Sequence, residues 1–111
     1  MIKVVFEKKE DKIVGFNISG HAEYDESGKD IVCAAVSMLV YNTIDTMTDL
    51  LKLKDYIEYK IDNDLITFKL IKELDEEQEK SFNLIMKKLE LGVISTVESY
   101  NKYIELYYVE V

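Results

Sequence analysis

The chain has 111 residues and a mass of 12.9 kDa, the size of one domain with a single core, and its hydrophobic fraction of 48% is ordinary for a globular protein. It has 14 lysines, no arginine and 22 acidic residues, so its net charge is −8. Nucleic-acid binding depends on neutralising phosphates, often through arginine, so this composition argues against it. We therefore expect one domain over residues 1–111 that does not bind nucleic acid directly.

The first 19 residues have the pattern of a β-hairpin. Apolar and polar residues alternate over 2–7 and again over 14–19, as in strands with one buried face, and the polar stretch 8–11 predicts the turn between them. Residues 20–29 follow neither the strand period nor the helix period. They contain two glycines and four charged residues, so we expect a surface loop there.

A long apolar block after Asp30 predicts a helix over about residues 31–52. The block is too long for one strand, and its later apolar residues are spaced three or four apart. Its first half is apolar all round, so we expect this helix to be buried on most sides. The N-terminus carries early charges, unlike a signal peptide, and no apolar run approaches the ~20 residues that span a bilayer. We therefore expect no membrane association.

Two further strands and the start of a second helix follow. Residues 56–61 and 65–70 alternate around Asp62-Asn63-Asp64, whose composition is typical of a hairpin turn. Asp75 and Gln78 have the spacing of a capping box, in which each residue satisfies a backbone N–H of the other. This pair predicts where the second helix begins.

The second helix and the C-terminal segment complete the predicted fold. An apolar stripe follows the capping box and indicates a helix that ends near Tyr100, and residues 103–111 are rich in strand-forming side chains. The order of elements is then ββαββαβ. It predicts an α+β fold: a two-layer sandwich with two helices packed on one mixed or antiparallel sheet. The stripe consists of Phe82, Ile85, Met86, Leu89, Val93 and Val97.

One cysteine and one histidine bound the possible chemistry. With Cys33 alone the chain forms no internal disulfide, which fits a reducing cytoplasm. With His21 alone it has too few ligands for a zinc site built from several cysteines or histidines. We expect no metal and no cofactor. Any reaction that needs a thiol or an imidazole must use these two residues.

The predicted helix start places Cys33 in a reactive position. Asp30 is the natural N-cap, so Cys33 is the third helical residue, where free N–H groups and the helix dipole stabilise an anion and ease ionisation of the thiol. The loop 22–29 returns the chain from His21 to this helix, so imidazole and thiol can meet as in nucleophilic cysteine catalysis. The same N–H groups offer an oxyanion hole. Taken alone, however, Cys33 in an apolar run equally fits an inert core residue, and His21 a surface histidine.

Two sequence elements favour the catalytic alternative. Gly20-His21-Ala22, followed by Gly28-Lys29-Asp30-Ile31-Val32-Cys33-Ala34-Ala35-Val36-Ser37, resembles the signature of the ribosomal-processing cysteine protease family, Prp. The resemblance implies a small homodimeric, cytoplasmic endopeptidase that removes the N-terminal extension of a basic large-subunit ribosomal protein, L-twenty-seven. It also implies that Cys33 is the nucleophile and His21 the general base.

Several neighbours have candidate supporting roles. Asp30 either orients His21 or only caps the helix, and the capping role is slightly favoured. Ser37 lies one helical turn after Cys33 and bonds either the thiol or a backbone carbonyl. We expect residues 22–29 to form a flap that rearranges to admit substrate, since they have little apolar area to pack. Its candidate hinge and contact residues are Gly20, Ala22, Tyr24 and Gly28.

A second class of function stays open at this point. A non-catalytic dimeric factor that binds a ribosomal protein or a precursor would have the same acidic surface, which attracts basic partners. Cys33 and His21 would then only shape the fold. Rapid alkylation of Cys33 in the native protein would favour the enzyme, and slow alkylation the binding factor.

Overall fold

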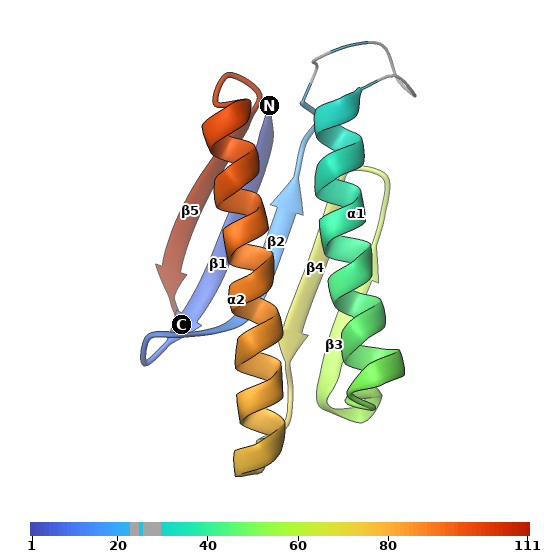
Figure 1. The fold of residues 1–111 in the computed structure, drawn as a ribbon, viewed down its shortest axis with the longest axis vertical. Coiled ribbons are helices and arrows are strands. Elements are labelled where there is room, and N and C mark those ends of the chain that lie inside the picture. The colour runs from blue at the N-terminus through green and yellow to red at the C-terminus, as the bar shows by residue number, and fades with distance from the viewer. Residues whose placement is uncertain (23–24, 26–29) are drawn as a thin grey trace.

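The computed structural model describes residues 1–22, 25 and 30–111, and it has the predicted two-layer α+β architecture (Figure 1). The strands form one sheet in the order β3-β4-β2-β1-β5, in which the β1–β5 pair is parallel and the other pairs are antiparallel. The predicted order of elements and the fold class are confirmed. The elements are β1 (Ile2–Lys9), β2 (Lys12–Ser19), α1 (Ile31–Asp45), a π-helical turn (Thr46–Leu50), a 3₁₀ turn (Lys54–Tyr56), β3 (Ile57–Ile61), β4 (Leu65–Leu70), α2 (Glu76–Ser99) and β5 (Ile104–Glu110).

The first hairpin forms as predicted, but its turn is tighter. The strands reach Lys9 and resume at Lys12, so only Glu10 and Asp11 connect them. These two residues have φ of 52° and 67°, the left-handed conformation that matches a tight hairpin turn to the twist of its strands. This turn lies at the opposite end of the sheet from the start of α1 (Figure 1).

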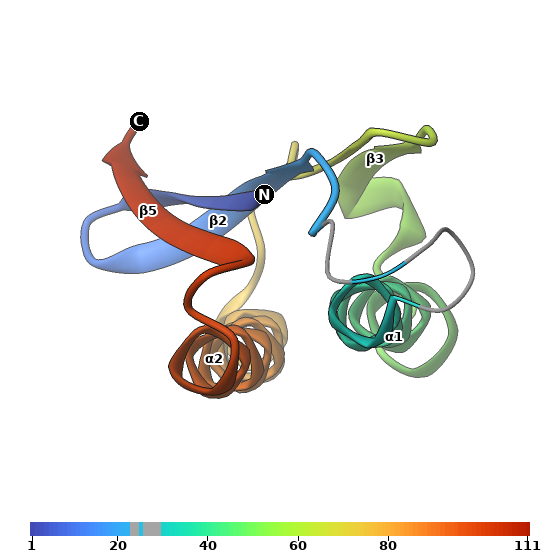
Figure 2. The ribbon, with the colours of Figure 1, turned by 90° about the horizontal axis from the view of Figure 1, so that it is seen from above.

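Both helices cover the same face of the sheet (Figure 2). Alternate residues of the strands point into the space between the layers, where Phe16 and Phe68 stack with ring centroids 4.9 Å apart. Phe82 of α2 packs on the same stack. The helices themselves approach closely at Gly92, where an added Cβ would lie 2.7 Å from Leu39 Cδ2. One continuous apolar core therefore holds the two layers together.

Helix α1 is less buried than predicted. Val32, Val36 and Val40 face the core, whereas Ile31 and Met38 are exposed, so the helix is buried along one side only. The apolar all-round pattern was misleading because it did not distinguish a buried face from an exposed apolar one. The exposed side lies away from the sheet.

The segment Ile31–Leu50 is also long and apolar enough to cross a membrane, with a mean hydropathy of 1.3 over the best window. The expectation that no apolar stretch reaches this length is therefore wrong. Length and composition alone do not distinguish a membrane span from a helix that packs on a sheet. In the fold this helix lies along β4 and α2 and contributes to the core.

The N-terminal end of α1 meets one end of the sheet. The chain leaves β2 after Ser19, and Gly20 donates its N–H to the carbonyl oxygen of Asp64, at 3.2 Å, in the turn between β3 and β4. The pairing of β2 with β4 ends one step earlier, at Ser19 and Leu65. The end of β2, the β3–β4 turn and the start of α1 are thus held together by the register of the sheet.

Candidate active site

Cys33 occupies the predicted position in the first turn of α1. Asp30 is the N-cap, and its Oδ1 accepts hydrogen bonds from the backbone N–H groups of Val32 and Cys33, both at 3.0 Å. The capping role of Asp30 is therefore present. This cap fixes the backbone from which the Cys33 side chain projects.

Gly20 fixes where the chain carries His21. It has φ of +84°, a conformation that residues with a Cβ rarely adopt, and a Cβ added there would collide with the carbonyl oxygen of Met1. Gly20 is therefore required by the local backbone, and its role as a hinge stays a prediction. The sharp turn aims His21 away from the strand direction and toward α1.

The residue after His21 connects directly to the thiol. Ala22 donates its backbone N–H to Cys33 Sγ, at 3.3 Å. Ala22 is itself 2% exposed and belongs to the apolar core. This bond spans the two sequence elements and holds His21 beside Cys33, although among the described residues no hydrogen bond joins the imidazole to the thiol.

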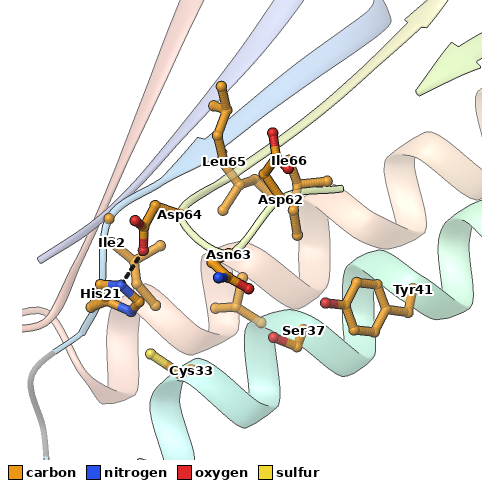
Figure 3. A pocket seen from close by; sticks show the side chains of 13 residues that line it. Ile2, His21, Cys33, Ser37, Tyr41, Asp62, Asn63, Asp64, Leu65 and Ile66 are labelled. Atoms are coloured by element: carbon orange, nitrogen blue, oxygen red, sulfur yellow. Dashed lines mark hydrogen bonds and ion pairs between the residues drawn. The ribbon is translucent and has the colours of Figure 1, made fainter. Parts of the chain in front are cut away.

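His21 and Cys33 line the same cavity of about 110 Å³ (Figure 3). Ser37 and Tyr41 follow Cys33 along α1 at helical spacing and line the same space. Several of its lining residues are aliphatic, so the cavity offers an apolar group a place beside the thiol. The remaining lining residues are Ile2, Ile18, Gly20, Val36, Asp62, Asn63, Asp64, Leu65 and Ile66.

The thiol does not ionise as easily as predicted. Burial raises the pKa of the Cys33 thiol above its ordinary value, and the charge of the Asp30 carboxylate raises it further. The Ala22 N–H and the N-terminal ammonium lower the pKa, but by less than the other effects raise it. The prediction overlooked that the carboxylate capping the helix also places a negative charge beside the sulfur. A neutral thiol therefore needs a base at the moment of attack.

Sequence reasoning missed a carboxylate partner of His21. His21 Nε2 and Asp64 Oδ1 form a hydrogen bond, although the two side chains are 61% and 72% exposed (Figure 3). Asp64 was interpreted only as part of a hairpin turn, because its 43-residue separation from His21 gives no local signal. The acidic composition of the turn was the one available hint.

The expected flap falls largely outside the described residues. Tyr24 and Gly28 belong to the part of the chain that the structure does not describe, so their predicted roles stay predictions. Ala22, at the start of the expected flap, is anchored in the core and not loose. Ser37 lines the cavity one helical turn after Cys33, and its hydrogen bond to the thiol or to a backbone carbonyl stays a prediction.

Comparison with known proteins gives relatives over the whole fold. The chain is 27% identical over 100 residues to the ribosomal processing cysteine protease Prp of Bacillus subtilis (strain 168), covering 89% of this chain and 86% of the relative. It is similar in structure to an essential ribosomal processing protease Prp from S. aureus with a covalently linked product peptide, with a TM-score of 0.82, 24% identity and coverage of 98% and 100% of the two chains.

A second structure of the S. aureus protease, in complex with a substrate peptide, has a TM-score of 0.76 and 22% identity, with 98% of this chain and 100% of that chain covered. At these identities the structural similarity speaks for the fold. The family model described as cysteine protease Prp matches residues 1–105, which include His21, Cys33 and every strand and helix up to the start of β5. The chain therefore belongs to the Prp family of cysteine proteases.

Proposed function

We propose that the chain is an endopeptidase that removes the N-terminal extension of a basic large-subunit ribosomal protein, L-twenty-seven, with Cys33 as nucleophile and His21 as general base. The observation that carries this proposal is the meeting of the chain's one cysteine and one histidine at one cavity. The Bacillus subtilis relative is a ribosomal processing protease, which supports the class of substrate.

The proposed reaction is acyl transfer through a thioester. His21 takes the proton of the Cys33 thiol as the sulfur attacks the peptide carbonyl carbon, because the raised pKa of the thiol keeps it protonated in the resting protein. The tetrahedral intermediate collapses, the C–N bond breaks, and the imidazolium gives its proton to the leaving amine. Water, deprotonated by His21, then hydrolyses the thioester and regenerates the thiol.

The oxyanion donor differs from the sequence-based prediction. The N–H groups of Val32 and Cys33 already donate to Asp30, so the first turn of α1 has two fewer donors to offer. The Ala22 N–H donates to the Cys33 sulfur at 3.3 Å, but this hydrogen bond is weak because a thiol sulfur is a poor acceptor. A carbonyl attacked by this sulfur develops its negative charge within reach of that N–H, which makes Ala22 the backbone donor of choice.

The proposed substrate agrees with the charge of the protein. A net charge of −8 steers lysine-rich and arginine-rich ribosomal proteins toward the surface. The same function assigns the enzyme to the cytoplasm, where ribosomal precursors are made.

A homodimer is part of the proposal. Met38 and Leu50 are 68% and 75% exposed and line a cavity of about 650 Å³ between α1 and α2. An apolar surface of this kind favours contact with a second copy. Analytical ultracentrifugation of the protein and of Met38→Lys tests this, with a dimer and a monomer expected respectively. A monomeric parent protein would contradict it.

The alternative function is a non-catalytic assembly factor that binds the precursor. Incubation of the protein with an N-terminally extended precursor, followed by intact mass measurement, separates the two classes. The proposal predicts the loss of one defined N-terminal peptide, with no loss when Cys33→Ala is used. A stable complex with uncleaved precursor would support the assembly factor instead.

A further inference from the structure

The β3–β4 turn presents a carboxylate to the outer side of the imidazole. Gly20 donates its N–H to the Asp64 carbonyl oxygen, and the next residue, His21, contacts the Asp64 side chain through Nε2. This pairing continues the β2–β4 ladder, which ends with Ser19 opposite Leu65. The contact is thus set by the backbone of the sheet, because Gly20 and Asp64 lie one step beyond the last paired strand residues and His21 directly follows Gly20.

The contact decides which nitrogen of the ring serves as the base. An ionised carboxylate only accepts hydrogen bonds, so Nε2 must carry the proton that it donates to Asp64. In the neutral ring the lone pair then lies on Nδ1. Figure 3 shows the Asp64 carboxylate on one side of the ring and the Cys33 sulfur on the other, so the unprotonated nitrogen is the one left for the thiol proton.

We infer that Asp64 is a positioning residue of the active site, which holds His21 in the Nε2-protonated tautomer so that Nδ1 acts as the general base for Cys33. This inference rests on the proposed function. The neighbouring turn carboxylate has another partner, since Asp62 pairs with Lys60 at 3.5 Å. Asp64 is therefore the turn residue that acts through the imidazole.

The exposure of the His21–Asp64 pair determines which kinetic parameter changes when Asp64 is lost. Water screens the His21–Asp64 interaction in the free protein, because both side chains are more than half exposed. A peptide bound across the cavity excludes that water and strengthens the interaction. Loss of Asp64 should therefore lower kcat more than it raises KM.

The test uses the single histidine of the chain. Ring nitrogen NMR shifts of a tag-free, ¹⁵N-histidine-labelled protein report the tautomer of His21 without overlap. The variants are Asp64→Ala, which removes the acceptor, and Asp64→Asn, whose uncharged amide can donate to Nε2 as well as accept from it. Asp11→Asn is the matched control, since it removes one carboxylate from the hairpin turn at the far end of the sheet, where asparagine also tolerates the φ of 67°.

The parent protein and Asp11→Asn are expected to show the Nε2-protonated ring. Asp64→Ala is expected to shift toward a mixture of tautomers and to lose roughly tenfold in kcat, and Asp64→Asn, whose amide can donate to Nε2, is expected to shift the ring toward the Nδ1-protonated tautomer and to lose at least as much. Unchanged ring shifts in Asp64→Ala would overturn the inference, and so would an unchanged kcat. If the parent protein cleaves no precursor, the proposed function fails, while the ring shifts still report whether Asp64 sets the tautomer.

Discussion

The two helices begin in nearly the same way, yet only α1 has a cysteine in its first turn. Each follows an aspartate whose carboxylate accepts N–H groups of the first turn: Asp30 from Val32 and Cys33, and Asp75 from Gln78. At α2 the third helical residue, Gln78, also accepts the Asp75 N–H at 2.9 Å and closes a capping box. At α1 that position is Cys33, whose side chain turns to Ala22.

The surroundings of the two ends differ as well. The first turn of α2 contains three glutamates and is largely exposed, whereas the first turn of α1 has no acidic residue and faces the cavity with His21. An aspartate N-cap therefore begins both helices. The residue at the third helical position determines whether the first turn has only a structural role. Capping satisfies the backbone, but it also determines the electrostatics around the thiol.

The largest difference between the two helix starts is expected when the third helical residue is substituted, Cys33 in α1 and Gln78 in α2. Cys33→Ala should abolish cleavage and leave the free energy of unfolding nearly unchanged, because losing a nucleophile costs several orders of magnitude in rate. Gln78→Ala should leave cleavage intact and cost about 0.5 kcal/mol of stability, within the range of a lost cap contact. Single-turnover kinetics and urea unfolding measure both. Residual cleavage by Cys33→Ala within tenfold of the parent would exclude Cys33 as nucleophile.

His21→Ala belongs to the same comparison. With no second histidine in the chain, no other imidazole can take its place, and cleavage should fall by at least about a thousandfold. The fold should persist, because the ring is exposed. Circular dichroism serves as the control for folding. Near-normal cleavage by this variant would leave the thiol without its proposed base.

Removal of either cap should lower the stability of the protein by a similar amount, but the two removals should differ in their effect on cleavage. Asp30→Ala and Asp75→Ala should each cost about 1 kcal/mol of stability, the usual worth of an N-cap. Only Asp30→Ala should also slow cleavage, because its cap fixes the backbone of Cys33. Thermal melting and cleavage rates of the two variants provide the measurement. Equal activity of both would mean that the cap contributes nothing beyond folding.

The pH dependence of alkylation tests the environment of the thiol. Burial and the Asp30 charge raise the pKa of Cys33, so the half-point of its iodoacetamide profile should lie above that of a cysteine peptide measured alongside. Cys33 should then react slowly at neutral pH, so the rate of alkylation does not separate the enzyme from the binding factor as the sequence alone predicted. Asp30→Asn removes the charge and should move the half-point down. A parent profile below that of the peptide would contradict the environment that we describe.

The smallest effect is expected from salt. Association with a basic precursor should weaken as ionic strength rises, because attraction between exposed charges is screened over about 10 Å at 0.1 M salt. The fall should appear in kcat/KM and spare the single-turnover rate of bound substrate. An uncharged peptide substrate is the control. Equal kcat/KM for the precursor at low and high salt would rule out steering.

Local patterns predicted the fold closely. Both hairpins, the start of α1 at Ile31 and the capping box of α2 depend on residues within a few positions of one another, so periodicity and capping rules suffice. The exposed side of α1 was not predictable in this way, because an apolar face has the same sequence pattern whether it is covered or not. The parallel pairing of β5 with β1 was one of two options that the sequence left open.

The candidate active site could be predicted only in part. Cys33 and His21 were singled out because each is the single residue of its type and lies in an element that resembles the family signature, and Asp30 because capping is local. The Asp64 contact depends on the register of β2 against β4, which no short-range signal encodes. The pKa of the thiol depends on burial and on a charge whose distance from the sulfur only the fold defines.

Trapping of the acyl-enzyme tests the central claim most directly. Hydroxylamine attacks a thioester and releases the acyl group as a hydroxamate, whether or not the intermediate accumulates. Precursor digested in the presence of hydroxylamine should yield the N-terminal peptide partly as a C-terminal hydroxamate, identified by mass, and Cys33→Ala should yield neither product. Release of the peptide only as the free acid at every hydroxylamine concentration would contradict covalent catalysis by Cys33.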